Sequence, residues 1–178
     1  GFKTGYRAHT PYIEVKVWIP ETISADAWLS KIEAAMAGAI VVKGDDAAVR
    51  FLKHLPAHRS LQIFDHATGG ALALRLQEGC SELAILPRMA LHSLFSEQGF
   101  LSESEMRQCL QEIDMQDQLL MMIGGINAEG AWSLGLQWGS QFYYADLQLP
   151  FKRKAVLNQR YVAELALIYW QEWLDALK

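Results

Sequence analysis

The first hydrophobic pattern in the chain is that of a strand with one buried face. Residues 13–19 alternate aliphatic side chains with polar or aromatic ones, and a period of two is typical of a strand. Ser24 then stands at a helix N-cap position, and the apolar side chains of residues 25–37 recur at helical spacing. With a second short apolar run at residues 39–42, the pattern predicts a small β-α-β unit over residues 1–44.

From residue 46 onward the pattern changes to an alternation of helices and strands. It predicts helices at residues 47–55, at the Ala- and Leu-rich residues 71–76 and after Ser102, with buried strands at residues 61–64 and 119–123. Ser102 and Glu105 have the spacing of a capping box, which marks the start of a helix. Between these elements we expect a short strand or extended segment at residues 81–86, and one or two helical turns at residues 89–95.

The last part of the chain predicts a hairpin and a long helix. Two strands, at residues 132–138 and 141–149, flank a Gly-Ser pair that suits a two-residue turn. A final helix is expected over residues 154–177, with these side chains facing inward: Leu157, Tyr161, Leu165, Ile168 and Trp173. The fold class predicted for residues 45–178 is therefore α/β: three α/β/α layers, with an antiparallel edge to the sheet.

Composition and charge narrow the classes of function. The chain has 178 residues, 51% of them hydrophobic, which is ordinary for a globular protein and ample for a core. Its 16 basic residues are scattered among 20 acidic ones, so we expect no nucleic acid as a partner. Cys80 and Cys109 lack metal-ligand spacing, and reduced thiols in a cytoplasmic protein are the expected state.

The sequence also predicts several absences. No apolar run approaches the length of a transmembrane helix, and no signal-peptide pattern is present, so we expect no membrane association. His54 and His58 are not spaced as ligands on one helix face, and we expect neither a metal nor a cofactor. Because the chain begins Gly-Phe-Lys without a methionine, we expect it to be part of a longer protein.

The turn at residues 65–70 is the strongest candidate for a ligand site. It joins a buried strand to a helix and contains Thr68, Gly69 and Gly70. Thr68 can cap the helix or give its hydroxyl to a phosphate oxygen. Backbone N–H groups of a first helical turn lack partners within the helix, and glycines let a phosphate approach them closely. Gly-Gly also serves tight turns that bind nothing, so a purely structural turn is the alternative. His66 contacts a ligand in the first interpretation and is a solvated loop residue in the second, with Asp65 capping the helix.

A second glycine pair follows the strand at residues 119–123. Gly124, Gly125 and Asn127 form the opposite wall of the same pocket in the functional interpretation. In the alternative interpretation they are a turn that needs a flexible backbone.

Several motifs together resemble the CinA (competence/damage-inducible protein) family. Residues 65–70 (Asp-His-Ala-Thr-Gly-Gly) resemble the Ala-Glu-Ser-Cys-Thr-Gly-Gly segment that opens the family's C-terminal domain. Residues 99–103 resemble its Gly-Ala-Val-Ser-Glu stretch, and residues 123–130 resemble its Thr-Gly-Ile-Ala-Gly-Pro-x-Gly loop. Residues 5–16 resemble the KH-like linking domain of longer members. The resemblance divides the chain into a partial KH-like domain at residues 1–44 and a CinA C-terminal domain at residues 45–178.

The resemblance implies a specific chemistry. Members of the family hydrolyse the amide of nicotinamide mononucleotide to nicotinate mononucleotide and ammonia, with a serine nucleophile assisted by a tyrosine and a lysine. Here His66 stands at the serine position and Ala67 at the cysteine position. The segment that carries the tyrosine and lysine is shortened to residues 83–89, which contain neither. We therefore expect no catalytic residues of the family type. The rate of amide hydrolysis should be lower by a factor on the order of 10⁴ or more.

Three hypotheses follow from these departures. In the first, the chain is a non-deamidating relative that binds a pyridine nucleotide or another phosphate-bearing small molecule and acts in oligomerisation or regulation. In the second, it is an active amidohydrolase with a rearranged site in which His66 or another group replaces the serine. In the third, it is a structural module. The resemblance also implies a homodimer, and a molybdopterin-binding-like domain preceding this chain in the full-length protein.

Overall fold

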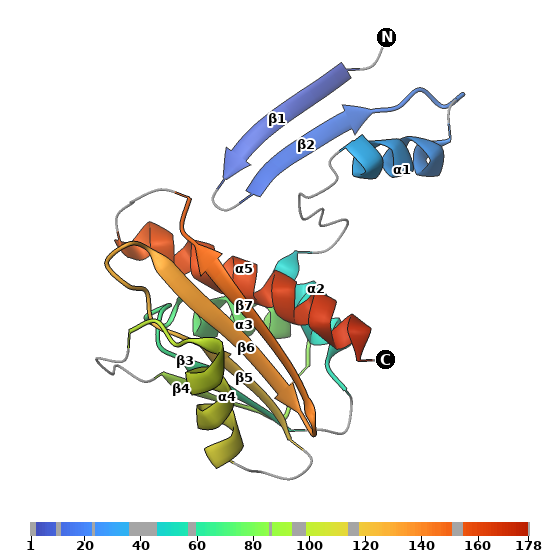
Figure 1. The fold of residues 1–178 in the computed structure, drawn as a ribbon. Coiled ribbons are helices and arrows are strands. Elements are labelled where there is room, and N and C mark those ends of the chain that lie inside the picture. Colours follow the sequence, from blue (N-terminus) through green and yellow to red (C-terminus); the bar gives the residue numbers. More distant parts are fainter. Residues whose placement is uncertain are drawn as a thin grey trace. The chain divides into compact units, whose positions relative to one another are not determined.

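The chain divides into two compact units. The computed structural model describes residues 3–9, 12–22, 24–35, 46–56, 60–85, 87–93, 99–113, 118–150 and 155–177. One unit is Gly1–Asp45 and the other is Asp46–Lys178, and each is described by itself (Figure 1). The identification of these parts as a KH-like linking domain and a CinA C-terminal domain stays a prediction.

The first unit contains a hairpin and one helix. Strand β1 (Lys3–His9) pairs antiparallel with β2 (Tyr12–Trp18), and α1 (Ala25–Ala35) follows. At the start of α1 the N–H of Trp28 donates to the carbonyl of Ser24 at 3.3 Å, as expected for the predicted N-cap. The sequence predicts no strand at β1, because its apolar and polar side chains show no sustained alternation. The predicted strand at residues 39–42 lies outside the described residues.

The second unit is built on a mixed sheet. In chain order its described elements are α2 (Ala47–His54), β3 (Leu61–Asp65), α3 (Ala71–Leu83), β4 (Met89–Ser93), α4 (Glu103–Glu112), β5 (Leu119–Ile123), β6 (Ala131–Trp138), β7 (Gln141–Gln148) and α5 (Ala155–Ala176). The five strands lie in the order β4-β3-β5-β6-β7. Strand β3 is parallel to both of its neighbours, whereas β6 and β7 form the antiparallel edge.

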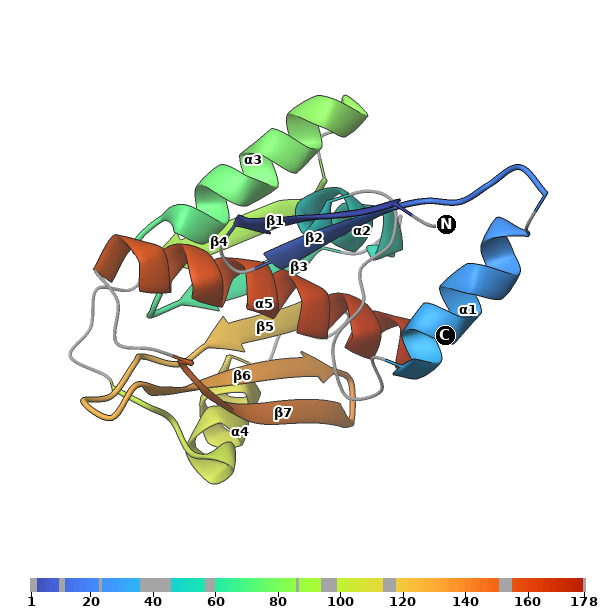
Figure 2. The same cartoon turned by 90° about the horizontal axis from the view of Figure 1, so that it is seen from above.

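The helices cover both faces of this sheet. Figure 2 shows α2, α3 and α5 on one side and α4 on the other. Helix α3 leads from β3 to β4, and the segment with α4 leads back past β3 to β5. Because both parallel crossovers must be right-handed and they run in opposite directions along the sheet, their helices lie on opposite faces. The predicted three-layer α/β architecture with an antiparallel edge is confirmed.

Two local predictions were wrong. Residues 81–83 continue α3 instead of forming a strand, and the helix ends where Ala84 adopts φ +52°. The usual glycine stop signal is absent there, which explains the error. Residues 89–93 are the strand β4, not helical turns. Met, Ala and Leu favour helices in isolation, but parallel pairing with β3 decides the conformation of this segment.

Helix α5 is buried over a broader face than its apolar pattern predicts. Ile168 is buried as predicted, but Leu157 is 39% exposed. The side chains of Tyr161, Leu165 and Trp173 are half-buried. The positions that pack inward are Val162, Ala163, Glu164, Ala166, Leu167, Ile168, Trp170, Gln171 and Leu174. Glu164 and Gln171 belong to this buried face, so the spacing of apolar residues alone predicts a buried face that is rotated around the helix from the observed one. In the described part of the chain, no helix has both the length and the apolar character that a membrane span requires.

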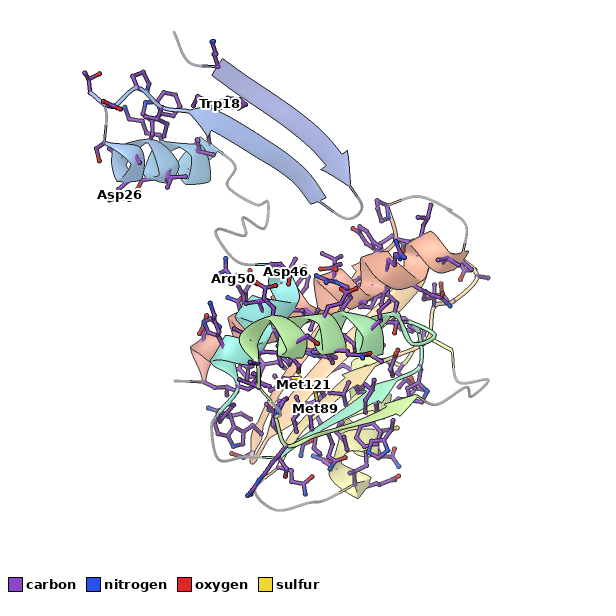
Figure 3. All side chains as sticks on the ribbon, turned by 180° about the vertical axis from the view of Figure 1, so that it is seen from behind. Trp18, Asp26, Asp46, Arg50, Met89 and Met121 are labelled. Atoms are coloured by element: carbon purple, nitrogen blue, oxygen red, sulfur yellow. The ribbon has the colours of Figure 1, made fainter. Side chains whose placement is uncertain are left out.

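Arg75 connects the three helices on one face of the sheet. Its guanidinium bonds to Glu164 on α5, to Asp46 at the N-cap of α2, and to Glu78 on its own helix. Asp46, which is labelled in Figure 3, also accepts hydrogen bonds from the N–H groups of Ala48 and Val49. The side chain of Glu164 is 8% exposed and that of Arg75 is 20% exposed. Burial disfavours the charged guanidinium, but its carboxylate partners outweigh this and raise the pKa of Arg75.

We predict that Arg75→Met lowers the free energy of unfolding by about 2–4 kcal/mol, because it removes the guanidinium that bonds to the buried carboxylate of Glu164. The double variant Arg75→Met/Glu164→Leu should recover most of this loss. The matched control is Arg107→Met, which removes an exposed ion pair with Glu103 and should cost at most about 1 kcal/mol. Urea unfolding measures all three variants. Equal costs for Arg75→Met and Arg107→Met would contradict the role of Arg75.

Candidate functional site

The turn after β3 is held by a buried carboxyl group. Asp65, the last residue of β3, is 3% exposed. Its Oδ1 accepts hydrogen bonds from the N–H of Ala67 at 3.1 Å and of Thr68 at 2.8 Å, and its Oδ2 accepts from the Thr68 hydroxyl. The side chain of Asp65 thus fixes three groups of the turn.

Thr68 carries the bonding from Asp65 into the helix. Its hydroxyl donates to Asp65 and accepts from the N–H of Leu72 at 3.1 Å, and the residue has no exposed surface. The sequence left open whether Thr68 caps the helix or binds a ligand. In this structure its hydroxyl hydrogen is engaged inside the chain and the hydroxyl caps α3. Its role as a ligand contact stays a prediction.

Gly69 and Gly70 bring the chain from the turn into α3. Their φ values are +56° and +94°, in the left-handed region that glycine adopts without strain. A Cβ on Gly69 would collide with the side chain of Gln159, whereas a Cβ on Gly70 would meet nothing. Gln159 comes from α5, more than 80 residues away in sequence, and no sequence pattern indicated its position against the turn.

The start of α3 has backbone N–H groups for which the described residues provide no acceptor. The N–H of Ala71 donates to the carbonyl of Thr68 at 3.0 Å, and that of Leu72 to the Thr68 hydroxyl. For the N–H groups of Gly69, Gly70 and Ala73, the described part of the chain has no hydrogen-bond acceptor. These donors lie at the positive end of a 13-residue helix, where an anion is favoured.

His66 lies beside these groups at the carboxyl end of the sheet. Its backbone N–H donates to the carbonyl of Ile123 at 3.1 Å, which joins the end of β3 to the end of β5. Its side chain is half-buried, and not the fully solvated loop residue of the structural interpretation. Burial lowers the pKa of His66, and the negative charge of Asp65 offsets this only in part.

The second glycine pair follows Ile123, whose carbonyl accepts from the N–H of His66 in the turn, and its own N–H groups bond within the chain. The N–H of Gly124 donates to the backbone carbonyl of Ser133 at 2.9 Å, and the N–H of Gly125 donates to the backbone carbonyl of Gly99 at 3.0 Å. A Cβ on Gly124 would collide with the Ser133 hydroxyl, so close packing explains this glycine. The predicted ligand roles of Gly124 and Gly125 stay untested.

Asn127 has a structural function in the same loop. Its Oδ1 accepts hydrogen bonds from the N–H of Glu129 at 3.0 Å and of Ala131 at 2.8 Å. This is the side-chain-to-backbone bonding by which asparagine stabilises turns. The role of Asn127 as a wall of a ligand pocket stays a prediction.

One serine that the sequence could not place lies near this edge. Ser133 on β6 is buried beside Gly124, and its hydroxyl accepts from the N–H of Leu101 at 3.3 Å. With no exposed surface, this hydroxyl is closed to a substrate. Among the described residues no group of three or more His, Cys, Asp or Glu side chains is placed to hold a metal ion. The arrangement can bind an anion but presents no serine nucleophile at the turn.

Fold and site together define an α/β protein of three layers with a glycine-containing turn at the carboxyl ends of parallel strands. No protein-family model matches the chain, and no curated protein matches it. Solved structures that are similar to it include two CinA superfamily proteins and a competence or damage-inducible protein. The protein from Klebsiella pneumoniae is 15% identical, with a TM-score of 0.49 over 73% of this chain and 96% of its own.

The other two structures are from Enterobacter species. The competence or damage-inducible protein from Enterobacter asburiae is 14% identical, with a TM-score of 0.48 over 76% of this chain and 100% of its own. The CinA superfamily protein from Enterobacter cloacae is 14% identical, with a TM-score of 0.49 over 79% of this chain and 98% of its own.

We predict that Thr68→Val lowers the free energy of unfolding by about 1–3 kcal/mol, because it leaves Asp65 and the N–H of Leu72 short of a partner. Thr68→Ser retains the hydroxyl and should cost less than about 1 kcal/mol. Chemical denaturation of both variants gives the comparison. Equal losses for the two substitutions would mean that the methyl group of Thr68, and not its hydroxyl, stabilises the turn.

We also predict that His66 makes stability depend on pH just below its ordinary pKa of 6.5. The native pKa of His66 is lower, so between the two pKa values the unfolded chain binds more protons than the native one. The contribution of His66 to stability is therefore fully present above this pH window and is lost as the pH falls through it. When the pH is lowered from about 7.5 to about 5.5, the free energy of unfolding of His66→Gln should fall less than that of the wild type. His92→Gln, at an exposed position, is the control. Parallel stability curves for the wild type and His66→Gln would contradict the prediction.

Proposed function

We propose that this chain is a non-deamidating protein that binds a phosphate-bearing small molecule, such as a pyridine nucleotide, at the turn between β3 and α3. The observation that carries the proposal is that the polar side chains of this turn are hydrogen-bonded within the chain, whereas backbone N–H groups beside them are not bonded to any described residue. The carboxyl of Asp65 and the hydroxyl of Thr68 bond to each other and to the backbone. Three N–H donors at the start of α3 remain for an anion.

The resemblance of residues 65–70 to the family's catalytic segment supports the class of ligand. Binding a phosphate through backbone N–H groups requires no side-chain chemistry, so it can persist where the nucleophile has been replaced. At neutral pH the lowered pKa of His66 leaves its ring largely uncharged. In that state the ring can donate one hydrogen bond and accept another, so it would contact a phosphate as a neutral group, and the positive end of the helix would supply the electrostatic attraction.

Catalysis is the weaker alternative, because amide hydrolysis needs an activated nucleophile beside a base. His66 has Asp65 as its neighbour, but that carboxyl group already accepts three hydrogen bonds from the turn. We therefore assign the chain a binding and regulatory role, and a homodimer remains part of this proposal.

We predict that nicotinate and nicotinamide mononucleotide bind to the wild type in calorimetric titrations without release of ammonia. Nicotinamide riboside lacks the phosphate and should bind about tenfold more weakly. Ala73→Glu should abolish mononucleotide binding, because it places a carboxylate in the first turn of α3, where it stabilises the helix and competes for the donors. Gln77→Glu adds the same charge one turn further along α3 and is the matched control.

The outcomes separate the three hypotheses. Ammonia release by the wild type would contradict the proposal and favour an amidohydrolase with a rearranged site. Absence of binding by every ligand would leave the turn as a structural element. Equal loss of binding in Ala73→Glu and Gln77→Glu would mean that the ligand responds to the general charge of α3 and not to its first turn.

A further inference from the structure

A cavity lies at the amino ends of the parallel strands, at the opposite end of the sheet from the turn. Its volume is about 410 Å³, within the range of small-molecule sites. Leu61 and Leu119 line it from the first positions of β3 and β5. Arg88 lines it from the position just before β4, whose first residue, Met89, is labelled in Figure 3. The amino ends of three parallel strands thus border the cavity, whereas the turn follows the carboxyl end of β3.

The walls of the cavity are largely apolar. Leucine side chains from α2, α3, β3 and β5 line it, together with two prolines and Ile85. The nearby backbone groups are already bonded, since the N–H of Leu61 donates to Arg88 at 2.8 Å and that of Leu119 to Ser60 at 3.1 Å. A ligand would therefore gain affinity from contact with hydrocarbon and not from hydrogen bonds to these strands.

Positive charge borders the same cavity. Arg88 and Lys53 both line it, and both are exposed. Arg88 has no ion-pair partner among the residues that the structure describes. A guanidinium matches the planar geometry of a carboxylate and binds it with two parallel hydrogen bonds. Apolar walls beside such a cation are complementary to an amphipathic anion.

We propose that this cavity binds a small aliphatic carboxylate, with the hydrocarbon among the leucines and the carboxylate at Arg88. This site is separate from the phosphate site of the proposed function, because the two lie at opposite ends of the parallel strands. Either can be present without the other, so the failure of one proposal leaves the second standing.

Octanoate is the probe for this site, and 1-octanol is its uncharged counterpart. We expect saturable binding of octanoate to the wild type in an NMR titration, with amide shifts centred on Leu61, Leu83 and Leu119. Arg88→Gln should weaken octanoate two- to fivefold, a range that corresponds to an exposed ion pair, and leave 1-octanol unchanged. Added salt should narrow the difference between the wild type and Arg88→Gln.

Two further variants complete the test. Arg160→Gln removes an exposed cation from the first half of α5, whose Gln159 packs against the turn, and should leave octanoate binding unchanged. Ile85→Trp adds bulk at a partly exposed wall and should weaken both ligands. The proposal is overturned if octanoate does not saturate, if shifts centre elsewhere, or if Arg88→Gln and Arg160→Gln bind octanoate equally.

Discussion

The buried carboxyl group of Asp65 is the constraint on which the turn depends. At the end of β3, which lies between β4 and β5, it accepts hydrogen bonds from the backbone of Ala67 and Thr68 and from the Thr68 hydroxyl. Burying such a group without these donors would cost several kcal/mol. The turn is therefore fixed by its own polar groups, and α3 begins from it in a set direction. The same bonding removes Asp65 and Thr68 from the groups that are free to react.

Helix placement follows from the topology of the sheet, and helix cohesion follows from charge. Right-handed crossovers place α3 and α4 on opposite faces. On the face shared by three helices, Arg75 joins α3 to α5 and to the cap of α2. A buried ion pair of this kind adds little to stability compared with an apolar pair, but it penalises arrangements in which one partner is left alone.

Much of the fold could be predicted from local patterns, whereas the site depended on contacts between distant segments. Buried strands such as β3 and β5, and the capping box at Ser102, have signals within a few residues. Strand β4 lacks one, because its pairing with β3 overrides its helix-forming composition. The closeness of the two glycine pairs could be inferred from parallel strand ends. The covering of Gly69 by Gln159, and of Gly124 by Ser133, could not, because those partners lie far away in sequence.

We propose that the turn offers backbone donors for an anion while its side chains maintain the fold. In an NMR titration with nicotinate mononucleotide we expect the largest amide shifts at Gly69, Gly70 and Ala73. The amide signals of Ala67 and Thr68 should stay close to their free positions, because their N–H groups remain bonded to Asp65. Shifts of Ala67 and Thr68 as large as those of the glycines, or no shifts in this turn at all, would contradict it.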